Sequence, residues 1–213
     1  MSLYGTLIDL GRKPSGLFGR LIGALMNVGH RDAYDWGLSY LLIDPNSIVL
    51  DVGCGGGGAM KLLAEKASEG KVYGIDHSMD MVNLARQVNK RFIEGGRIEI
   101  NYGSVSQLPY SENMFDTVTA FETIEFWPNL SEDFREVKRF LKPGGVLLIV
   151  NRHSRTEKKE SKRARSIQIN TSNEYRKRLE DAGYIDIILD DHSRKGWIVV
   201  VAKKPQGSAW PPW

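Results

Sequence analysis

The chain of 213 residues contains a single cysteine, Cys54, so it cannot form a disulfide within itself. This excludes a disulfide-stapled scaffold and fits a reducing compartment. A long hydrophobic run is also missing, because the longest weakly polar stretch, residues 21–29, is far below the roughly 20 apolar residues that span a bilayer. No basic residue precedes Arg12 and no signal peptide is recognisable, so we expect a cytoplasmic protein without a membrane segment.

The chain has little net charge. The formal value of +3 is too small to indicate a nucleic-acid partner by itself. With 41% hydrophobic and 26% charged residues, the composition is that of an ordinary globular protein, and the length favours one main domain. We expect a helical cap over residues 1–47, the main domain over 48–204 and a short tail over 205–213.

The expected cap contains two apolar patterns at helical spacing, separated by a break at residues 28–30. The first includes Leu17, Leu21 and Leu25, and the second includes Tyr34, Leu38 and Leu41. These helices either cover only a sheet edge or also cap a ligand pocket above residues 53–57. The tail ends in Trp-Pro-Pro-Trp, which cannot continue a sheet and is expected to dock on the protein or on a second copy, or to stay disordered.

From residue 48 the pattern alternates between strand and helix. Strands are predicted at 48–52, 71–76, 97–102, 115–121 and 146–150, with helices at about 58–69, 79–93 and 131–141. This order is typical of a doubly wound, Rossmann-like parallel sheet. After a helix at 172–182, strands at 184–189 and 196–203 are joined by a short turn, so the last strand should be antiparallel. We therefore predict an α/β fold with seven strands, mostly parallel, and helices on both faces.

The first predicted strand leads into the most distinctive stretch of the chain, Ile-Val-Leu-Asp-Val-Gly-Cys-Gly-Gly-Gly-Gly at residues 48–58. Glycines let the backbone approach a ligand, and a following helix start offers unpaired N–H groups. A strand, a glycine-rich turn and a helix start in this order are typical of a binding site for an adenosine-type cofactor. The dinucleotide pattern Gly53-x-Gly55-x-x-Gly58 fits, and so does a pattern with an acid, Asp51, two residues before the first glycine. The loop alone leaves both interpretations open.

The blocks that follow the loop decide between them. They are Gly-Ile-Asp-His-Ser at 74–78 with Met81, Leu-Pro-Tyr at 108–110 before Phe-Asp-Thr-Val at 115–118, and Leu-Lys-Pro-Gly-Gly at 141–145. These blocks, in this order, resemble those of the class I S-adenosylmethionine-dependent methyltransferases. The resemblance covers about residues 46–203 and is strongest to the small-molecule group similar to methyltransferase domains 11 and 25. A nicotinamide dehydrogenase would share the loop but not the later blocks.

The resemblance implies S-adenosylmethionine as cofactor, S-adenosylhomocysteine as product and no metal. It implies that Asp76 accepts hydrogen bonds from the ribose hydroxyls, that Gly53 and Gly55 lie beside the methionine portion, and that Asp51 orients the loop and reaches the cofactor's ammonium through water. Met81 would pack on the adenine. The full set of expected cofactor-binding residues is Asp51, Gly53, Cys54, Gly55, Asp76, His77, Met81, Gly103, Ser104, Val105 and Phe121.

Gly103-Ser104-Val105 stands where the family often has Gly-Asp-Ala, so a charged acceptor for the adenine amino group is missing and the cofactor affinity should be lower. The Ser104 hydroxyl and the Val105 amide can still bond the ring. Cys54 is expected to be a small spacer in the loop and not a nucleophile.

Methyl transfer mainly requires alignment of the acceptor, so no fixed catalytic triad is expected. Because the carboxyl ends of parallel strands face the ligand crevice, acceptor residues should follow the strand at 115–121. Glu122 or Glu125 would bind a cationic acceptor or serve as base, and Phe126 or Trp127 would form an aromatic wall. His153, after the strand at 146–150, is a further candidate base. His30 and Tyr34 of the cap are weaker candidates.

The segment 152–165 carries seven basic and two acidic residues, a local charge of +5. It is a solvated insertion, a clamp for an anionic acceptor or a phosphate-tracking patch on RNA, and the lack of interleaved aromatics weakens the RNA interpretation. The sequence thus predicts a methyltransferase for a small-molecule acceptor, as a monomer or homodimer and without a nucleic-acid partner. The alternatives are an RNA or protein methyltransferase that uses this segment, and a non-catalytic S-adenosylmethionine-binding protein.

Overall fold

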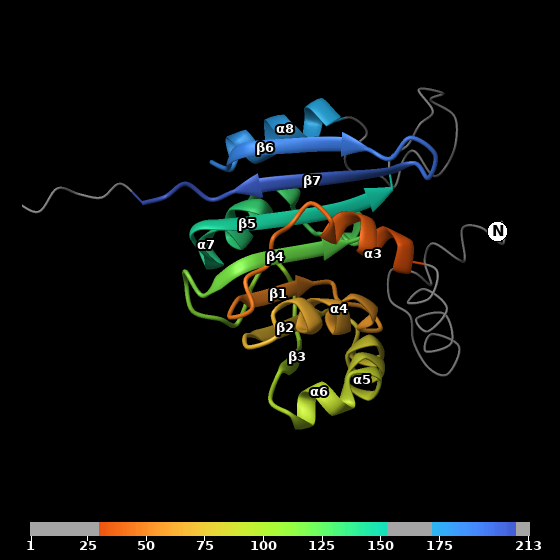
Figure 1. The fold of residues 1–213 in the computed structure, drawn as a ribbon. Coiled ribbons are helices and arrows are strands. Elements are labelled where there is room, and N and C mark those ends of the chain that lie inside the picture. Colours follow the sequence, from red (N-terminus) through yellow and green to blue (C-terminus); the bar gives the residue numbers. More distant parts are fainter. Residues whose placement is uncertain (1–29, 153–171, 208–213) are drawn as a thin grey trace, which may run out of the picture.

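The computed structural model describes residues 30–152 and 172–207, which fold around one seven-stranded sheet (Figure 1). The strands lie in the order β3-β2-β1-β4-β5-β7-β6. Their bounds are β1 Ile48–Val52, β2 Lys71–Asp76, β3 Ile98–Tyr102, β4 Phe115–Phe121, β5 Leu141–Arg152, β6 Ile185–Asp191 and β7 Trp197–Lys203. Neighbours from β3 to β5 are parallel, and β7 is antiparallel to both β5 and β6. The predicted fold class is confirmed, including the antiparallel last strand.

Helices cover both faces of this sheet. They are α3 Arg31–Leu38, α4 Gly58–Lys66, α5 Met79–Val88, α6 Lys90–Glu94, α7 Leu130–Phe140 and α8 Ser172–Asp181, with a 3₁₀ turn η1 Ile124–Phe126. Buried side chains of α3, α4 and α5 form one core cluster, and those of α7 and α8 form the other. Strand β1 contributes Val49 to the first cluster and Leu50 to the second, as alternation in a strand requires. No helix in residues 30–152 and 172–207 combines the length and the apolarity needed to cross a membrane.

Strand β5 is longer than the predicted 146–150. Leu141 pairs with Phe115 before a register shift, and pairing with β4 resumes at Val146. The chain therefore stays beside the sheet through Lys-Pro-Gly-Gly at 142–145, where Gly144 has φ +77° and donates its N–H to the Lys204 carbonyl at 3.1 Å. The glycine-rich segment that ends α7 thus also starts the strand.

The prediction of one helix at 79–93 is wrong, because the helix is interrupted at Asn89. The Asn89 side chain is buried, and its Nδ2 donates at 3.0 Å to the carbonyls of Gly57 and Ala85. Since Gly57 is the N-cap of α4, this interruption ties α5 to the glycine loop. The helix predicted at 58–69 also ends earlier, at Lys66.

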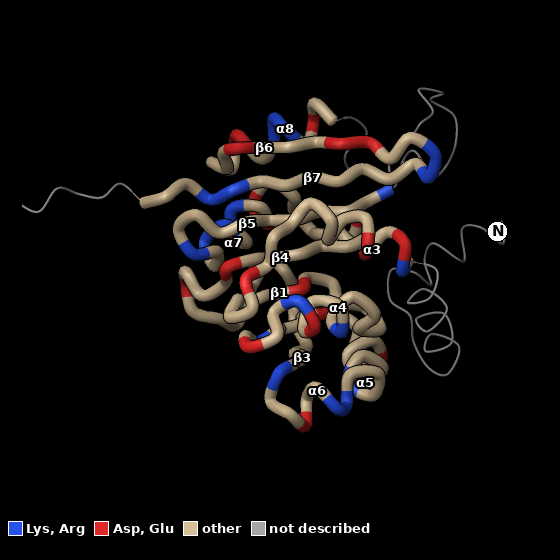
Figure 2. Tube along the Cα trace, in the orientation of Figure 1, with Lys and Arg blue, Asp and Glu red and all other residues tan. Residues whose placement is uncertain are grey.

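Of the expected cap, the structure describes residues 30–47, which include helix α3; residues 1–29 lie outside the described residues. A Cβ added at Gly37 would clash with Val150 of β5, so the helix backbone approaches the sheet closely there. Lys195, in the basic turn between β6 and β7, pairs with Asp32 of α3 at 3.0 Å (Figure 2). The ring centroids of Trp36 and Trp197 are 6.2 Å apart. These contacts place α3 over β5 and β7, next to the carboxyl end of β4.

Candidate cofactor and acceptor site

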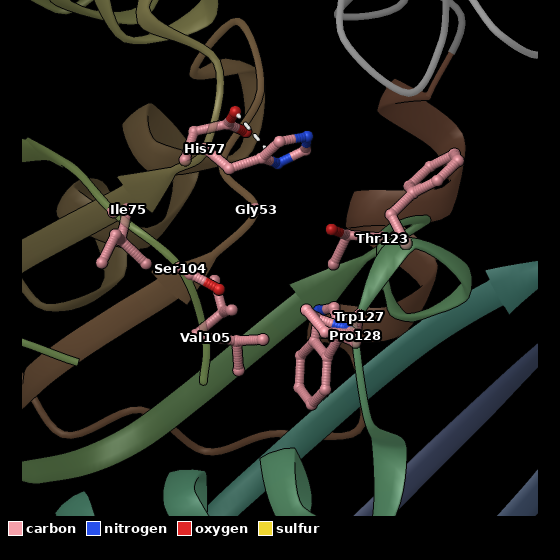
Figure 3. Close-up of a pocket in the computed structure, with 12 residues that line it drawn as sticks. Gly53, Ile75, His77, Ser104, Val105, Thr123, Trp127 and Pro128 are labelled. Atoms are coloured by element: carbon pink, nitrogen blue, oxygen red, sulfur yellow. Dashed lines mark ion pairs between the residues drawn. The ribbon is translucent and has the colours of Figure 1, made fainter. Parts of the chain in front are cut away.

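A cavity lies where the winding of the sheet reverses, at the carboxyl ends of β1 and β4. The chain leaves β1 through α4 on one face and leaves β4 through α7 on the other, so a crevice opens between them, the usual ligand site of such sheets. The cavity has a volume of about 160 Å³ (Figure 3). It is lined by Val52, Gly53, Ile75, Asp76, His77, Gly103, Ser104, Val105, Thr123, Phe126, Trp127 and Pro128.

The glycine loop after β1 is held by backbone hydrogen bonds. The N–H groups of Gly53 and Cys54 donate to the Ile75 carbonyl at 2.8 and 3.1 Å. Gly53, Gly55 and Gly57 all have positive φ, between +51° and +78°, a region that L side chains rarely adopt. A Cβ on Gly55 would meet nothing within 4 Å, so space for a ligand lies open beside it. The path of the backbone therefore favours glycine at these three positions of the loop.

Asp76 ends β2 at the edge of the cavity. Its Oδ2 accepts from the Gly55 N–H at 2.9 Å and its Oδ1 accepts from the Ser78 N–H at 2.8 Å. His77 Nδ1 is 3.8 Å from Oδ1 (Figure 3). Burial raises the pKa of Asp76, and the two amide hydrogen bonds oppose that rise. An ionised carboxylate offers about four lone-pair sites, so acceptor capacity remains for two ribose hydroxyls.

Asp51 lies behind the loop and is only 2% exposed. Thr119 of β4 donates its hydroxyl to Asp51 Oδ1 at 2.7 Å. Burial raises the pKa of Asp51 to about 7, with a contribution from the charge of Asp76 and an opposing one from Thr119. Two buried carboxylates thus stand beneath the loop, which suits a cationic group above it.

Three other predicted residues are buried near the cavity but do not line it. Cys54 is 7% exposed, and burial with the nearby charges of Asp76 and Asp51 raises the pKa of its thiol, so the thiol stays protonated. Met81 is 3% exposed, and its contact with adenine stays a prediction. Phe121 packs against Tyr34 of α3, with ring centroids 5.0 Å apart.

The segment after β3 lines the cavity, opposite the loop after β4 (Figure 3). A Cβ on Gly103 would contact the Ile75 side chain at 2.8 Å, which explains the glycine at that position. The Ser104 hydroxyl accepts from the Ser106 N–H at 3.3 Å. Ser104 and Val105 are thus brought to the cavity, in the place where the family often has an acid.

Thr123 lines the cavity but is not among the site residues predicted from the sequence. A Cβ on Gly53 would clash with the Thr123 hydroxyl, so Thr123 covers the first glycine of the loop. Val52 and Ile75 also line the cavity and were not expected there. Phe126 and Trp127, expected on the acceptor side, line the same cavity. Only the position of Thr123, two residues past a strand end, hinted at its role.

The acceptor candidates lie beside the cavity. Glu122 Oε2 is 3.1 Å from Arg152 Nε, at the carboxyl ends of β4 and β5. Glu125 lies in η1 and is half-buried. His153 lies outside the described residues, as does most of the basic segment. The described residues contain no group of three or more His, Cys, Asp or Glu side chains that could hold a metal ion.

Comparison with known families agrees with this geometry. The model of the methyltransferase domain family matches residues 43–183. The chain therefore belongs to this family, and its resemblance to the class I S-adenosylmethionine-dependent methyltransferases is confirmed. S-adenosylmethionine is the cofactor that the family uses, and the cavity residues fit it: a glycine loop, a strand-end acid and an open edge.

The relatives differ in their acceptors. The chain is 34% identical over 121 residues to 24-methylenesterol C-methyltransferase 2 of Arabidopsis thaliana, covering 55% of this chain and 33% of that protein. It is 33% identical over 150 residues to phosphoethanolamine N-methyltransferase 1 of Triticum aestivum, covering 68% of this chain and 30% of that protein. The chain thus spans about a third of the length of these two curated relatives.

Among solved structures, the cyclase SpnF has a TM-score of 0.72 at 20% sequence identity. The match covers 83% of this chain and 81% of that protein. At this identity the likeness shows the fold alone. A cyclase with this fold also illustrates that the fold does not determine the reaction.

Proposed function

We propose that this chain transfers the methyl group of S-adenosylmethionine to a small-molecule acceptor by in-line displacement. The observation that carries the proposal is the bond between Gly55 N–H and the Asp76 carboxylate at 2.9 Å, which fixes the strand-end acid and the glycine loop as one unit at the edge of the cavity. When bound, the cofactor supplies a methyl group on sulfonium sulfur, an already activated donor. The residues of the chain have to bind the cofactor, orient the acceptor toward its methyl group and exclude water.

Each side chain has a separate task. Asp76 accepts from the ribose hydroxyls with the acceptor capacity left by its two amide bonds. Ser104 and the Val105 amide face the adenine, in place of the acid common in the family. Asp51 supplies negative charge beneath the loop toward the cofactor's ammonium. Trp127 and Phe126 exclude water from the cavity that they line. Alignment of this kind is worth effective molarities of ~10⁵–10⁸ M.

A small-molecule acceptor is supported by the named acceptors of the relatives, a sterol and phosphoethanolamine. Both are small, yet one is methylated on carbon and the other on nitrogen. The family therefore supports the acceptor's size and leaves its reacting atom open.

Calorimetry with the purified chain tests cofactor binding. We expect S-adenosylmethionine and S-adenosylhomocysteine to bind at micromolar concentrations and NAD to show no binding. Tighter binding of NAD would contradict the proposal. Release of S-adenosylhomocysteine in the presence of acceptor mixtures then separates an enzyme from a non-catalytic cofactor-binding protein.

A further inference from the structure

The first turn of α7 contains a buried carboxylate, that of Asp133, which is only 1% exposed. Its Oδ1 accepts from the Ser106 hydroxyl at 2.6 Å, and its Oδ2 accepts from the Asn129 N–H at 2.9 Å. A buried carboxylate is costly unless hydrogen bonds or charges compensate it, and a helix N-terminus favours negative charge. The two hydrogen bonds therefore hold Asp133 in place, and they connect it with two different segments of the chain.

The first bond leads to the segment after β3. There the Gln107 N–H donates to the Ser104 carbonyl at 3.2 Å, which closes a tight turn. Within this turn the Ser106 N–H donates to the Ser104 hydroxyl at 3.3 Å. Ser104 lines the cavity. The bond between Ser106 and Asp133 thus fixes a turn whose first residue is part of the site.

The second bond leads to the loop after β4. Asn129 is the N-cap of α7, and it directly follows Trp127 and Pro128, which line the cavity opposite the segment after β3 (Figure 3). The Trp127 ring packs against Phe134, the neighbour of Asp133 in α7, with ring centroids 5.7 Å apart. The first turn of α7 therefore holds this wall of the cavity by its backbone and by the indole.

A bond to the N-cap alone would make Asp133 an ordinary helix cap, but its other bond reaches Ser106, 27 positions earlier in the chain. A second contact runs in the same direction, because the Leu108 N–H donates to Glu136 Oε1 of α7 at 3.4 Å. Val105 and Leu108 are buried in the core cluster that contains the buried side chains of α7. The turn after β3 thus lies along α7, with Asp133 at the junction.

We propose that Asp133 is a positioning residue, whose two hydrogen bonds keep Ser104 and Trp127 at a fixed separation across the cavity. This rests on the proposed methyltransferase function, in which Ser104 faces the adenine and Trp127 belongs to the acceptor side. Asp133 does not line the cavity and acts through its neighbours. Because alignment is the main requirement of methyl transfer, a carboxylate that holds both walls links cofactor binding to the shape of the acceptor side.

The first test measures the Kd of S-adenosylhomocysteine by calorimetry. Ser106→Ala removes the bond to the turn and leaves the bond to the N-cap, so the Kd should rise by roughly 3–10-fold, the effect of one lost hydrogen bond. Ser106→Thr keeps the hydroxyl and should bind like the wild type. The matched control is Ser131→Ala, in the same turn of α7, because the Ser131 hydroxyl accepts from Arg178 Nη1 at 3.4 Å on α8. Thermal melting checks that each variant folds.

The second test follows the fluorescence of Trp127, on the opposite wall. Its signal is identified as the part of the response to S-adenosylhomocysteine that is lost in Trp127→Phe. We expect this response to be smaller at saturation in Ser106→Ala than in the wild type or in Ser131→Ala. A raised Kd with the full Trp127 response would mean that Ser106 positions its own turn alone, which overturns the link between the two walls.

A double-mutant cycle separates the link from general stability. Asp133→Asn disturbs both bonds and should weaken S-adenosylhomocysteine binding more than Ser106→Ala does. The double variant should bind like Asp133→Asn alone, because the two residues act through one bond. Additive effects, or wild-type affinity in Ser106→Ala, overturn the inference and leave the methyltransferase function intact. Failure of the wild type to bind S-adenosylhomocysteine overturns the proposed function and this inference with it.

Discussion

The carboxylate of Asp76 accepts a hydrogen bond from the Gly55 N–H at 2.9 Å, which joins the end of β2 to the glycine loop after β1. The two motifs that the sequence suggested separately are thus parts of one structure. The acid at the end of β2 positions the loop, and the loop amide holds the acid. A change at either residue is therefore expected to affect both.

Asp76→Ala should weaken binding of S-adenosylhomocysteine by about 10–100-fold, because one or two charge-assisted hydrogen bonds to the ribose are lost. It should also destabilise the fold by roughly 1–3 kcal/mol, since the Gly55 and Ser78 amides lose their acceptor. Calorimetry and urea unfolding measure the two effects. Asp191→Ala is the control, because Asp191 also ends a strand but is exposed. An unchanged dissociation constant would mean that the ribose is held elsewhere.

Gly53→Ala should abolish cofactor binding. The substitution places a methyl group on backbone at φ +70° and against the Thr123 hydroxyl. Gly96→Ala is a matched control, because Gly96 has the same φ of +70° but nothing within 4 Å of an added Cβ. Both variants bear the conformational cost of roughly 1–2 kcal/mol, while only Gly53→Ala should lose S-adenosylhomocysteine binding in calorimetry. Equal binding by the two variants would show that the contact between Gly53 and Thr123 is unimportant.

The sequence predicted β1, β2 and β4 to the residue, because each is a short apolar run bounded by polar or glycine residues. It did not predict the interruption at Asn89, since the helical pattern continues locally and the Gly57 carbonyl that Asn89 binds lies 32 positions earlier. The pairing of Glu122 with Arg152 was missed for the same reason. Spacing shows which residues share a face, whereas these contacts depend on how distant segments meet in the sheet.

Gly37→Ala should displace α3 from the sheet, because an added Cβ would clash with Val150. We expect a loss of roughly 1–3 kcal/mol in the free energy of unfolding, typical of overpacking. Asp35→Ala, on the exposed side of the same helix, should change stability by less than about 0.5 kcal/mol. Urea unfolding compares the two. If Tyr34 contacts the acceptor, Gly37→Ala should also raise KM for it, which Asp35→Ala should not do.

Asp51 makes stability depend on pH. Its pKa is raised to about 7 in the folded protein, above the ordinary value of an unfolded chain, so between about pH 4 and pH 7 the folded state binds more protons. The contribution of Asp51 therefore destabilises increasingly as pH rises through this window and is constant above it. Asp51→Asn removes this contribution. At pH 8 the free energy of unfolding of the variant, relative to that of the wild type, should therefore be higher by an amount on the order of 4 kcal/mol than at low pH. A stability difference that does not vary from pH 5 to pH 8 would contradict the raised pKa.

The same carboxyl should make cofactor affinity rise with pH. A cationic ammonium above the loop favours the ionised form of Asp51, so a proton must leave Asp51 before binding below its pKa of about 7. The Kd of S-adenosylhomocysteine should therefore fall between pH 6 and pH 8, by up to about tenfold per unit below pH 7. In Asp51→Asn, the Kd should stay near the weaker value of the wild type at low pH and should not change with pH. His77 Nδ1 lies 3.8 Å from Asp76 Oδ1, so His77→Ala should be measured alongside. If the profile persists in Asp51→Asn and disappears in His77→Ala, Asp51 does not interact with the ammonium.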